Sequence, residues 1–100
     1  MNVIIKSVKF KASDNLKAFI TEKLKKLFRH SDSIIRAIAV LRKSESKNPQ
    51  NKLCEIRLMV PGYDYYVKKS SGDYQKSVSQ AVEALEEIIR RNKTRLLVNR

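Results

Sequence analysis

The sequence is poor in the residues that build disulfide frameworks and linkers: among 100 residues it has one cysteine, two glycines, two prolines and no tryptophan. Cys54, being alone, allows no internal disulfide and no cysteine-rich metal site, and it suits a reducing compartment. No apolar run approaches the roughly 20 residues of a membrane helix, and the apolar start "VII" is too short for the core of a signal peptide. We therefore expect a cytoplasmic protein with no membrane role.

Acidic residues are scarce relative to basic ones. The chain carries 22 Lys and Arg against 10 Asp and Glu, which gives a formal net charge of +12. Residues 1–50 hold twelve of the bases and only four of the acids. A chain of this length is most simply one domain, residues 1–100, and such a surplus of positive charge attracts polyanions and speeds their encounter. A solvated basic face is the plainer alternative.

Signatures of catalysis are missing as well. The acids are scattered, no pair of them flanks a candidate nucleophile, and there is no glycine-rich phosphate loop. His30 is the single histidine and stands at a predicted helix end, where capping or a phosphate contact is a simpler role than catalysis. Cys54 alternates with Ile56 and Leu58, which places it in the core. We expect no enzyme, no metal and no cofactor.

The first half of the chain shows a strand, a helix and a second strand by its apolar periodicity. The first strand is predicted over residues 2–8, and the helix over residues 14–29 with Ser13 as its N-cap. The segment "IIRAIAVLRKS" predicts a long strand, with Ile34, Arg36, Ile38 and Val40 at alternate positions.

The second half predicts a hairpin followed by a helix. "LCEIRLMV" and "YDYYVKKS" read as paired strands over residues 53–70, joined by the strong turn signal Pro61-Gly62. Asp73 is the expected N-cap of the last helix. The buried stripes of the two helices are expected to comprise Leu16, Phe19, Ile20, Leu24 and Leu27 in the first, and Val78, Ala81, Val82, Leu85, Ile88 and Ile89 in the second.

Two helices that each bury one apolar stripe against a single sheet predict a two-layer α+β fold. Its order is β-α-β-β-β-α, with a four-stranded sheet and both helices on one face, similar to double-stranded-RNA-binding domains. The lysine-rich start of the second helix that is typical of those domains is absent, because "DYQKSVSQAV" contains only Lys76. No helix-turn-helix or zinc-finger pattern indicates DNA as a partner.

Basic residues flank the apolar stripe of each predicted helix. At 100° per residue, Lys23, Lys26 and His30 share one flank of the first helix, and Arg91 and Arg95 share one flank of the last. Long cations spaced along a rigid element suit phosphate contacts. Acid–base pairs four residues apart and the helix dipole explain where the side-chain charge along the last helix changes from negative to positive. They do not explain the surplus of bases.

Three tyrosines stand close together directly after the turn of the predicted hairpin. Tyr63, Tyr65 and Tyr66 are residues on which RNA bases stack, but tyrosine is also common as ordinary sheet packing. Alternation separates Tyr66 from the other two, so they do not form one platform. Packing is favoured over base stacking.

The chain resembles the ribosome hibernation factors, the family of the ribosome-associated inhibitor and hibernation-promoting factor, also called sigma-54 modulation proteins. The resemblance spans residues 2–97 and rests on "NVIIKSVKF", "ASDNLKAFITEKLKKL", "IAVLRK" and "SGDYQKSVSQAVEALEEIIRRNKTR". It implies a non-enzymatic protein that binds rRNA of the small ribosomal subunit in the mRNA and tRNA channel and silences translation in slow growth or stress. The chain departs from the Asp-Met-Tyr that often opens the last helix of the family, since it has Asp73-Tyr74-Gln75.

The resemblance also implies which residues bind rRNA. We expect a short form of the family that does not pair ribosomes itself. Whether a separate dimerisation factor pairs them is left open. A regulator that binds another protein, as the sigma-factor name suggests, and a general RNA-binding protein are the alternatives. The expected rRNA-binding residues are Lys23, Lys26, Arg91, Lys93 and Arg95, with Lys68 and Lys69 near the turn into the last helix as weaker candidates.

Overall fold

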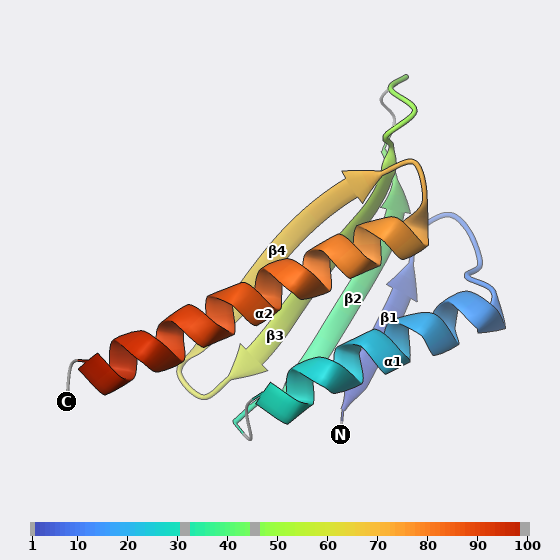
Figure 1. Cartoon of the computed structure of the whole chain (residues 1–100). Helices are drawn as coiled ribbons and strands as arrows, with labels where there is room; N and C mark the ends of the chain where they lie inside the picture. Colours follow the sequence, from blue (N-terminus) through green and yellow to red (C-terminus); the bar gives the residue numbers. More distant parts are fainter. Residues whose placement is uncertain (1, 31–32, 45–46, 99–100) are drawn as a thin grey trace.

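The computed structural model describes residues 2–30, 33–44 and 47–98, with the side chains of residue 30 and of residues 92–98 outside the described part. The predicted order β-α-β-β-β-α is confirmed, and Figure 1 shows both helices on the same face of the sheet. The elements are β1 (Val3–Ser7), α1 (Asp14–His30), β2 (Arg36–Lys43), β3 (Lys52–Val60), β4 (Tyr63–Ser71) and α2 (Tyr74–Val98).

The sheet has the strand order β1-β2-β3-β4. β1 pairs with β2 in parallel, whereas β2–β3 and β3–β4 are antiparallel. β1, β2 and β4 therefore run in one direction, and each helix returns against the strand before it. As a result α1 and α2 run the same way across the sheet, and their C-terminal ends lie on the same side of the molecule (Figure 1).

Both helices begin at the predicted caps. The backbone N–H of Leu16 donates to Oγ of Ser13 at 3.1 Å, and the N–H of Gln75 donates to Oδ1 of Asp73 at 3.3 Å. Each bond satisfies a backbone donor that the first turn of a helix leaves without a partner. In the described part of the chain no helix, including the 25-residue α2, is long and apolar enough to cross a membrane.

The core lies between the sheet and the two helices. Ile20, Leu24 and Leu27 of α1 and Val78 and Leu85 of α2 are fully buried, as their spacing predicts. The inward face of β3 is the predicted one, with Cys54, Ile56 and Leu58 buried. On β2 the inward residues are Ala37, Ala39 and Leu41, while Ile38 and Val40 lie on the open face of the sheet. The small alanine side chains leave room for the helix residues above them.

The hairpin turns at Pro61-Gly62, as predicted. Gly62 has a φ of 92°, a left-handed conformation that residues with a side chain adopt only at a cost. The turn places Tyr63 opposite Val60 and sets the register of the hairpin, in which Arg57 lies opposite Tyr66. Residues at odd positions of β4, from Tyr63 to Lys69, therefore share the face that carries the helices.

Candidate nucleic-acid interface

The basic side chains of α1 lie in its second half. Lys26 is exposed, whereas Lys23 is half-buried with its Nζ 5.5 Å from the centroid of the Phe19 ring. The face of an aromatic ring attracts an ammonium group, so Phe19 holds Lys23 against the edge of the apolar stripe. Within the described residues, no carboxylate lies at ion-pair distance from Lys23 or Lys26, while the neighbouring Lys25 has Glu22 at 3.6 Å.

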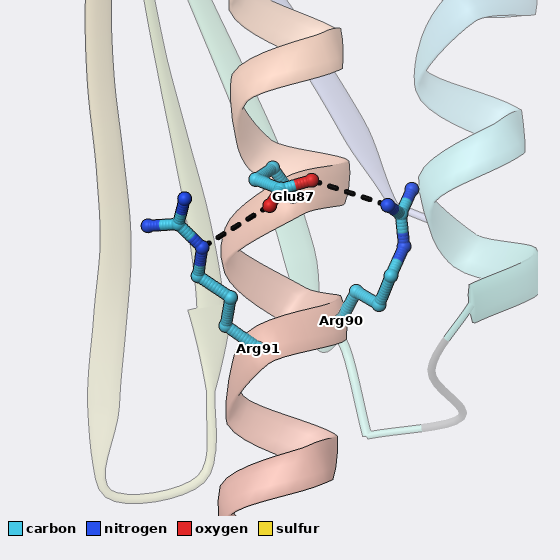
Figure 2. Close-up of polar contacts among 3 residues, drawn as sticks. All are labelled: Glu87, Arg90 and Arg91. Atoms are coloured by element: carbon cyan, nitrogen blue, oxygen red, sulfur yellow. Dashed lines mark hydrogen bonds and ion pairs between the residues drawn. The ribbon is translucent and has the colours of Figure 1, made fainter.

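On α2 a single carboxylate lies between two arginines. Oε1 of Glu87 lies 3.1 Å from Nε of Arg91, and Oε2 lies 3.1 Å from Nη1 of Arg90 (Figure 2). Both guanidinium groups are largely in solvent, with 71% of the Arg91 side chain exposed. Exposed pairs of this kind contribute less than about 1 kcal/mol, so both arginines remain available to a phosphate.

The predicted cations Lys93 and Arg95 belong to the last turns of α2. Their side chains lie outside the described part of the structure. The backbone places them beyond Arg91, where Figure 1 shows α2 projecting past the turn between β3 and β4. They remain predictions as phosphate-binding residues.

The fold brings the C-terminal halves of the two helices to the same end of the molecule (Figure 1). Because α1 and α2 run in the same direction, Lys23, Lys26 and Arg91 all belong to the C-terminal halves of neighbouring helices (Figure 1). The negative ends of both helix dipoles favour cations there, which accounts for part of the arrangement. Cations on rigid helices suit the spaced phosphates of a nucleic acid, but Figure 2 shows Arg90 on the flank of α2 toward α1 and Arg91 on the opposite flank.

Lys68 and Lys69 lie apart from this group. They stand near the end of β4, at the opposite end of the sheet from the C-termini of the helices. Lys68 pairs in register with Glu55 on the open face, and Lys69 pairs with Cys54 on the helix face, so the two side chains point to opposite sides. The structure therefore does not join them to the helix cations in one surface.

Cations on the open face of the sheet were missed by the sequence analysis. Arg42 Nε lies 3.1 Å from Oε1 of Glu55, and the hydroxyl of Tyr66 donates to Oε2 of the same carboxylate at 2.9 Å. This hydrogen bond is the main reason why the pKa of Tyr66 is raised above its usual value. Arg57 lies with its guanidinium carbon 5.7 Å from the centre of the Tyr66 ring. The sequence signal that could have revealed these cations is the alternation of basic and apolar residues in β2 and β3.

The tyrosines do not form one platform, in agreement with their alternation. Tyr63 and Tyr65 contact each other edge to face, with ring centres 5.1 Å apart and hydroxyl oxygens 2.8 Å apart. Tyr66 lies on the other face of the sheet, where it is held by Glu55. Each of the three tyrosines thus makes a contact with another residue of the hairpin.

A groove of about 990 Å³ opens at the end of the sheet where α2 begins. It lies between the loop after β1, the end of β2, the start of β3 and the first residue of α2. Its lining includes Lys9, Phe10, Lys43, Lys52 and Tyr74, which no sequence motif connects. This end of the molecule is opposite the C-terminal ends of the helices (Figure 1).

Two solved structures share this architecture. The crystal structure of the N-terminal domain of Protein Y from Thermus thermophilus superposes with a TM-score of 0.77 at 24% identity, covering 91% of this chain and 98% of that one. A ribosomal subunit interface protein from Coxiella burnetii superposes with a TM-score of 0.78 at 20% identity, covering 94% and 99%. At these identities the likeness establishes the fold. No curated protein sequence matches the chain significantly.

The sequence itself matches a family model over nearly its whole length. The match spans residues 3–97, which includes every helix and strand up to the last turn of α2. The model describes the sigma 54 modulation proteins and the S30EA ribosomal protein. It agrees with the fold and with the resemblance seen in the sequence, so the chain belongs to the sigma 54 modulation protein / S30EA ribosomal protein family.

Proposed function

We propose that residues 1–100 form one domain that binds the rRNA of the small ribosomal subunit and silences translation in slow growth or stress. The observation that supports the proposal is the pair of parallel helices in a member of the S30EA family, whose C-terminal halves lie at the same end of the molecule and contain Lys23, Lys26 and Arg91. The structural likeness to a ribosomal subunit interface protein from Coxiella burnetii supports the same class of partner.

The contacts are ionic and are made chiefly to phosphates. Lys26 and Arg91 are exposed, and Lys23 is held at the edge of the helix by Phe19. Together with Lys93 and Arg95 they provide five cations along two neighbouring helices, a layout suited to a folded RNA backbone. Lys68 and Lys69 contribute less, because they lie at the other end of the sheet and point to opposite faces.

Silencing follows from occupancy and requires no chemical step. A domain seated in the channel between the head and body of the small subunit occupies the space that mRNA and tRNA need. It acts in the cytoplasm, and this role is compatible with a separate dimerisation factor that pairs ribosomes. The large positive net charge of +12 speeds the encounter with the ribosome.

The salt dependence of binding tests the phosphate contacts. If the five helix cations each neutralise one phosphate, the logarithm of the affinity for purified small subunits falls with the logarithm of salt with a slope of about −3.5 to −4.5. Replacing Lys23 and Lys26 by glutamine flattens this slope by roughly one per lysine. A slope near zero, or one that these replacements leave unchanged, contradicts the proposal.

A protein-binding regulator is the second candidate. The description of the family names sigma 54 modulation, and the open face of the sheet combines apolar residues such as Ile38 and Val40 with Arg42 and Arg57. This candidate predicts capture of a single protein partner in the absence of ribosomes. A general RNA-binding protein instead predicts equal affinity for small subunits and for unrelated structured RNA.

A further inference from the structure

The groove at the start of α2 contains an aromatic pair that the fold assembles from distant segments. The rings of Phe10 and Tyr74 are stacked, with centres 4.9 Å apart and planes inclined by 13°. Both rings are half-buried, pack against the core and line the groove, and because they stack on each other, one face of each ring is covered by its partner. Half-buried aromatic rings of this kind are surfaces against which nucleobases pack.

Cations surround the aromatic pair. Lys9, Lys43 and Lys52 line the groove, and none of the described residues in its lining is acidic. Among the described residues none of the three lysines makes an ion pair, whereas Arg42, which also lines the groove, is held by Glu55 at 3.1 Å. Nζ of Lys52 lies 5.9 Å from the centre of the Tyr74 ring. Three lysines gathered around one groove attract an anion to this point.

Two backbone segments at the groove make specific contacts or adopt an uncommon conformation. Lys9, which precedes Phe10, has a φ of 66°, a conformation that is uncommon for any residue other than glycine. Such strained residues persist only where the surrounding structure holds them, and they cluster at binding sites. The N–H of Val8, the residue before Lys9, donates to the carbonyl of Leu41 at 2.9 Å. On the other wall, the carbonyl of Lys52 accepts the hydroxyl of the buried Ser77 at 2.6 Å.

We propose that this groove binds a phosphorylated nucleotide, with the phosphate held by Lys43 and Lys52 and the base packed against Phe10 and Tyr74. Its volume of about 990 Å³ admits one or more nucleotides. The nucleotide is either free or part of single-stranded RNA, because both present the same phosphate and base. The site is separate from the helix cations proposed to bind rRNA, since it lies at the opposite end of the molecule (Figure 1).

Titration of the isotopically labelled protein, followed by its amide NMR spectrum, tests this site. The probes are AMP, a 5′-phosphorylated adenosine trinucleotide, adenosine and inorganic phosphate. We expect AMP or the trinucleotide to cause saturable shifts at the amides of Phe10, Ser44 and Asn51, and adenosine and phosphate to bind more weakly than AMP. A trinucleotide that binds much more tightly than AMP assigns the site to an RNA strand, and equal affinities assign it to a free nucleotide.

Matched substitutions locate the ligand. Lys43→Gln and Lys52→Gln are each expected to weaken binding roughly tenfold, because each removes one charged contact to the phosphate. Lys17→Gln, at an exposed position of α1 outside the groove, removes the same charge and leaves the affinity unchanged. Tyr74→Leu abolishes the preference for AMP over phosphate, and the NMR spectrum of each variant shows whether it is folded.

Three outcomes overturn the inference. They are the absence of saturable shifts with AMP and the trinucleotide up to about 10 mM, binding that neither lysine substitution weakens, and equal affinity for AMP and inorganic phosphate. The test is independent of the proposed function. If the Lys23 and Lys26 variants lose ribosome binding, their titration with AMP is expected to stay unchanged. If the groove binds no nucleotide, the salt dependence of ribosome binding is expected to stay unchanged.

Discussion

Oε1 of Glu87 lies 3.1 Å from Nε of Arg91, and its second oxygen lies 3.1 Å from Nη1 of Arg90 (Figure 2). One exposed carboxylate thus pairs with two exposed guanidinium groups. The spacing of four residues between Glu87 and Arg91 predicts their pair, which the structure contains, and this pair helps to explain where α2 changes from acidic to basic. It leaves one net positive charge among these three residues, so helix electrostatics accounts for the position of the cations but not for their surplus.

Arg91→Glu is expected to weaken binding to small ribosomal subunits and to lower the magnitude of the salt slope by about one, because one phosphate contact is lost. The free energy of unfolding changes by less than about 1 kcal/mol, since the lost pair is exposed and the new like charges are four residues apart. Affinity at several salt concentrations and urea unfolding measure the two effects. Lys76→Glu, at the start of the same helix, is the matched control and keeps full affinity. A large loss of stability in Arg91→Glu would assign this arginine a structural role.

Glu87→Gln is expected to have the opposite effect on affinity. The substitution removes the negative charge that Arg90 and Arg91 share, so that a phosphate no longer competes with this carboxylate for them. Binding to small subunits at low salt should tighten by a few fold, while stability falls by less than about 1 kcal/mol. Competition against labelled wild-type protein measures the change. Weaker binding in this variant would mean that Glu87 itself contacts the ribosome.

Ser77→Ala is expected to destabilise the protein by about 1–3 kcal/mol, because it removes hydrogen bonds in a buried position. The Ser77 hydroxyl lies 2.6 Å from the carbonyl oxygen of Lys52 and 2.7 Å from the hydroxyl of Ser71, and the residue is fully buried. Urea unfolding measures the loss, and Ser70→Ala, at an exposed position of β4, serves as the control. Equal stability of the two variants would contradict the importance of this hydrogen-bonded junction.

The alkaline stability of the protein should depend on Cys54. Burial is the main cause that raises the pKa of its thiol from 9.0 to about 12, with the negative charge of Glu55 as a smaller cause. The unfolded chain then loses the thiol proton near pH 9 while the folded chain keeps it, so this group's stabilising contribution is complete below pH 9 and declines as the pH rises toward 12. Cys54→Ala should show a shallower decline over this range. Parallel curves for the two proteins would contradict the shifted thiol.

The sequence predicts the helices and the hairpin well because their signals are local. Ser13 and Asp73 cap the helices that they precede, and alternation correctly places Cys54, Ile56 and Leu58 inside. Alternation does not predict which face of β2 is buried. Its residues are apolar on both faces, so only the packing of the helices over Ala37 and Ala39 decides which face is buried.

The sites differ in how far local patterns reveal them. Helical spacing groups Lys23 with Lys26 as a predicted site, because both lie on one regular element. The groove was beyond such reasoning, since Phe10 and Tyr74 are far apart in sequence and meet only when α2 packs next to the loop after β1. Lys68 and Lys69 illustrate the reverse case, in which neighbours in sequence point to opposite faces of the sheet.

The most direct test of the account is co-sedimentation of the purified protein with small ribosomal subunits, with and without mRNA plus initiator tRNA. We predict stoichiometric binding to the free subunit and displacement of the protein when mRNA and tRNA occupy the channel. Binding that is indifferent to mRNA and tRNA would contradict the proposed position in the channel, and the absence of binding would contradict the ribosomal partner itself.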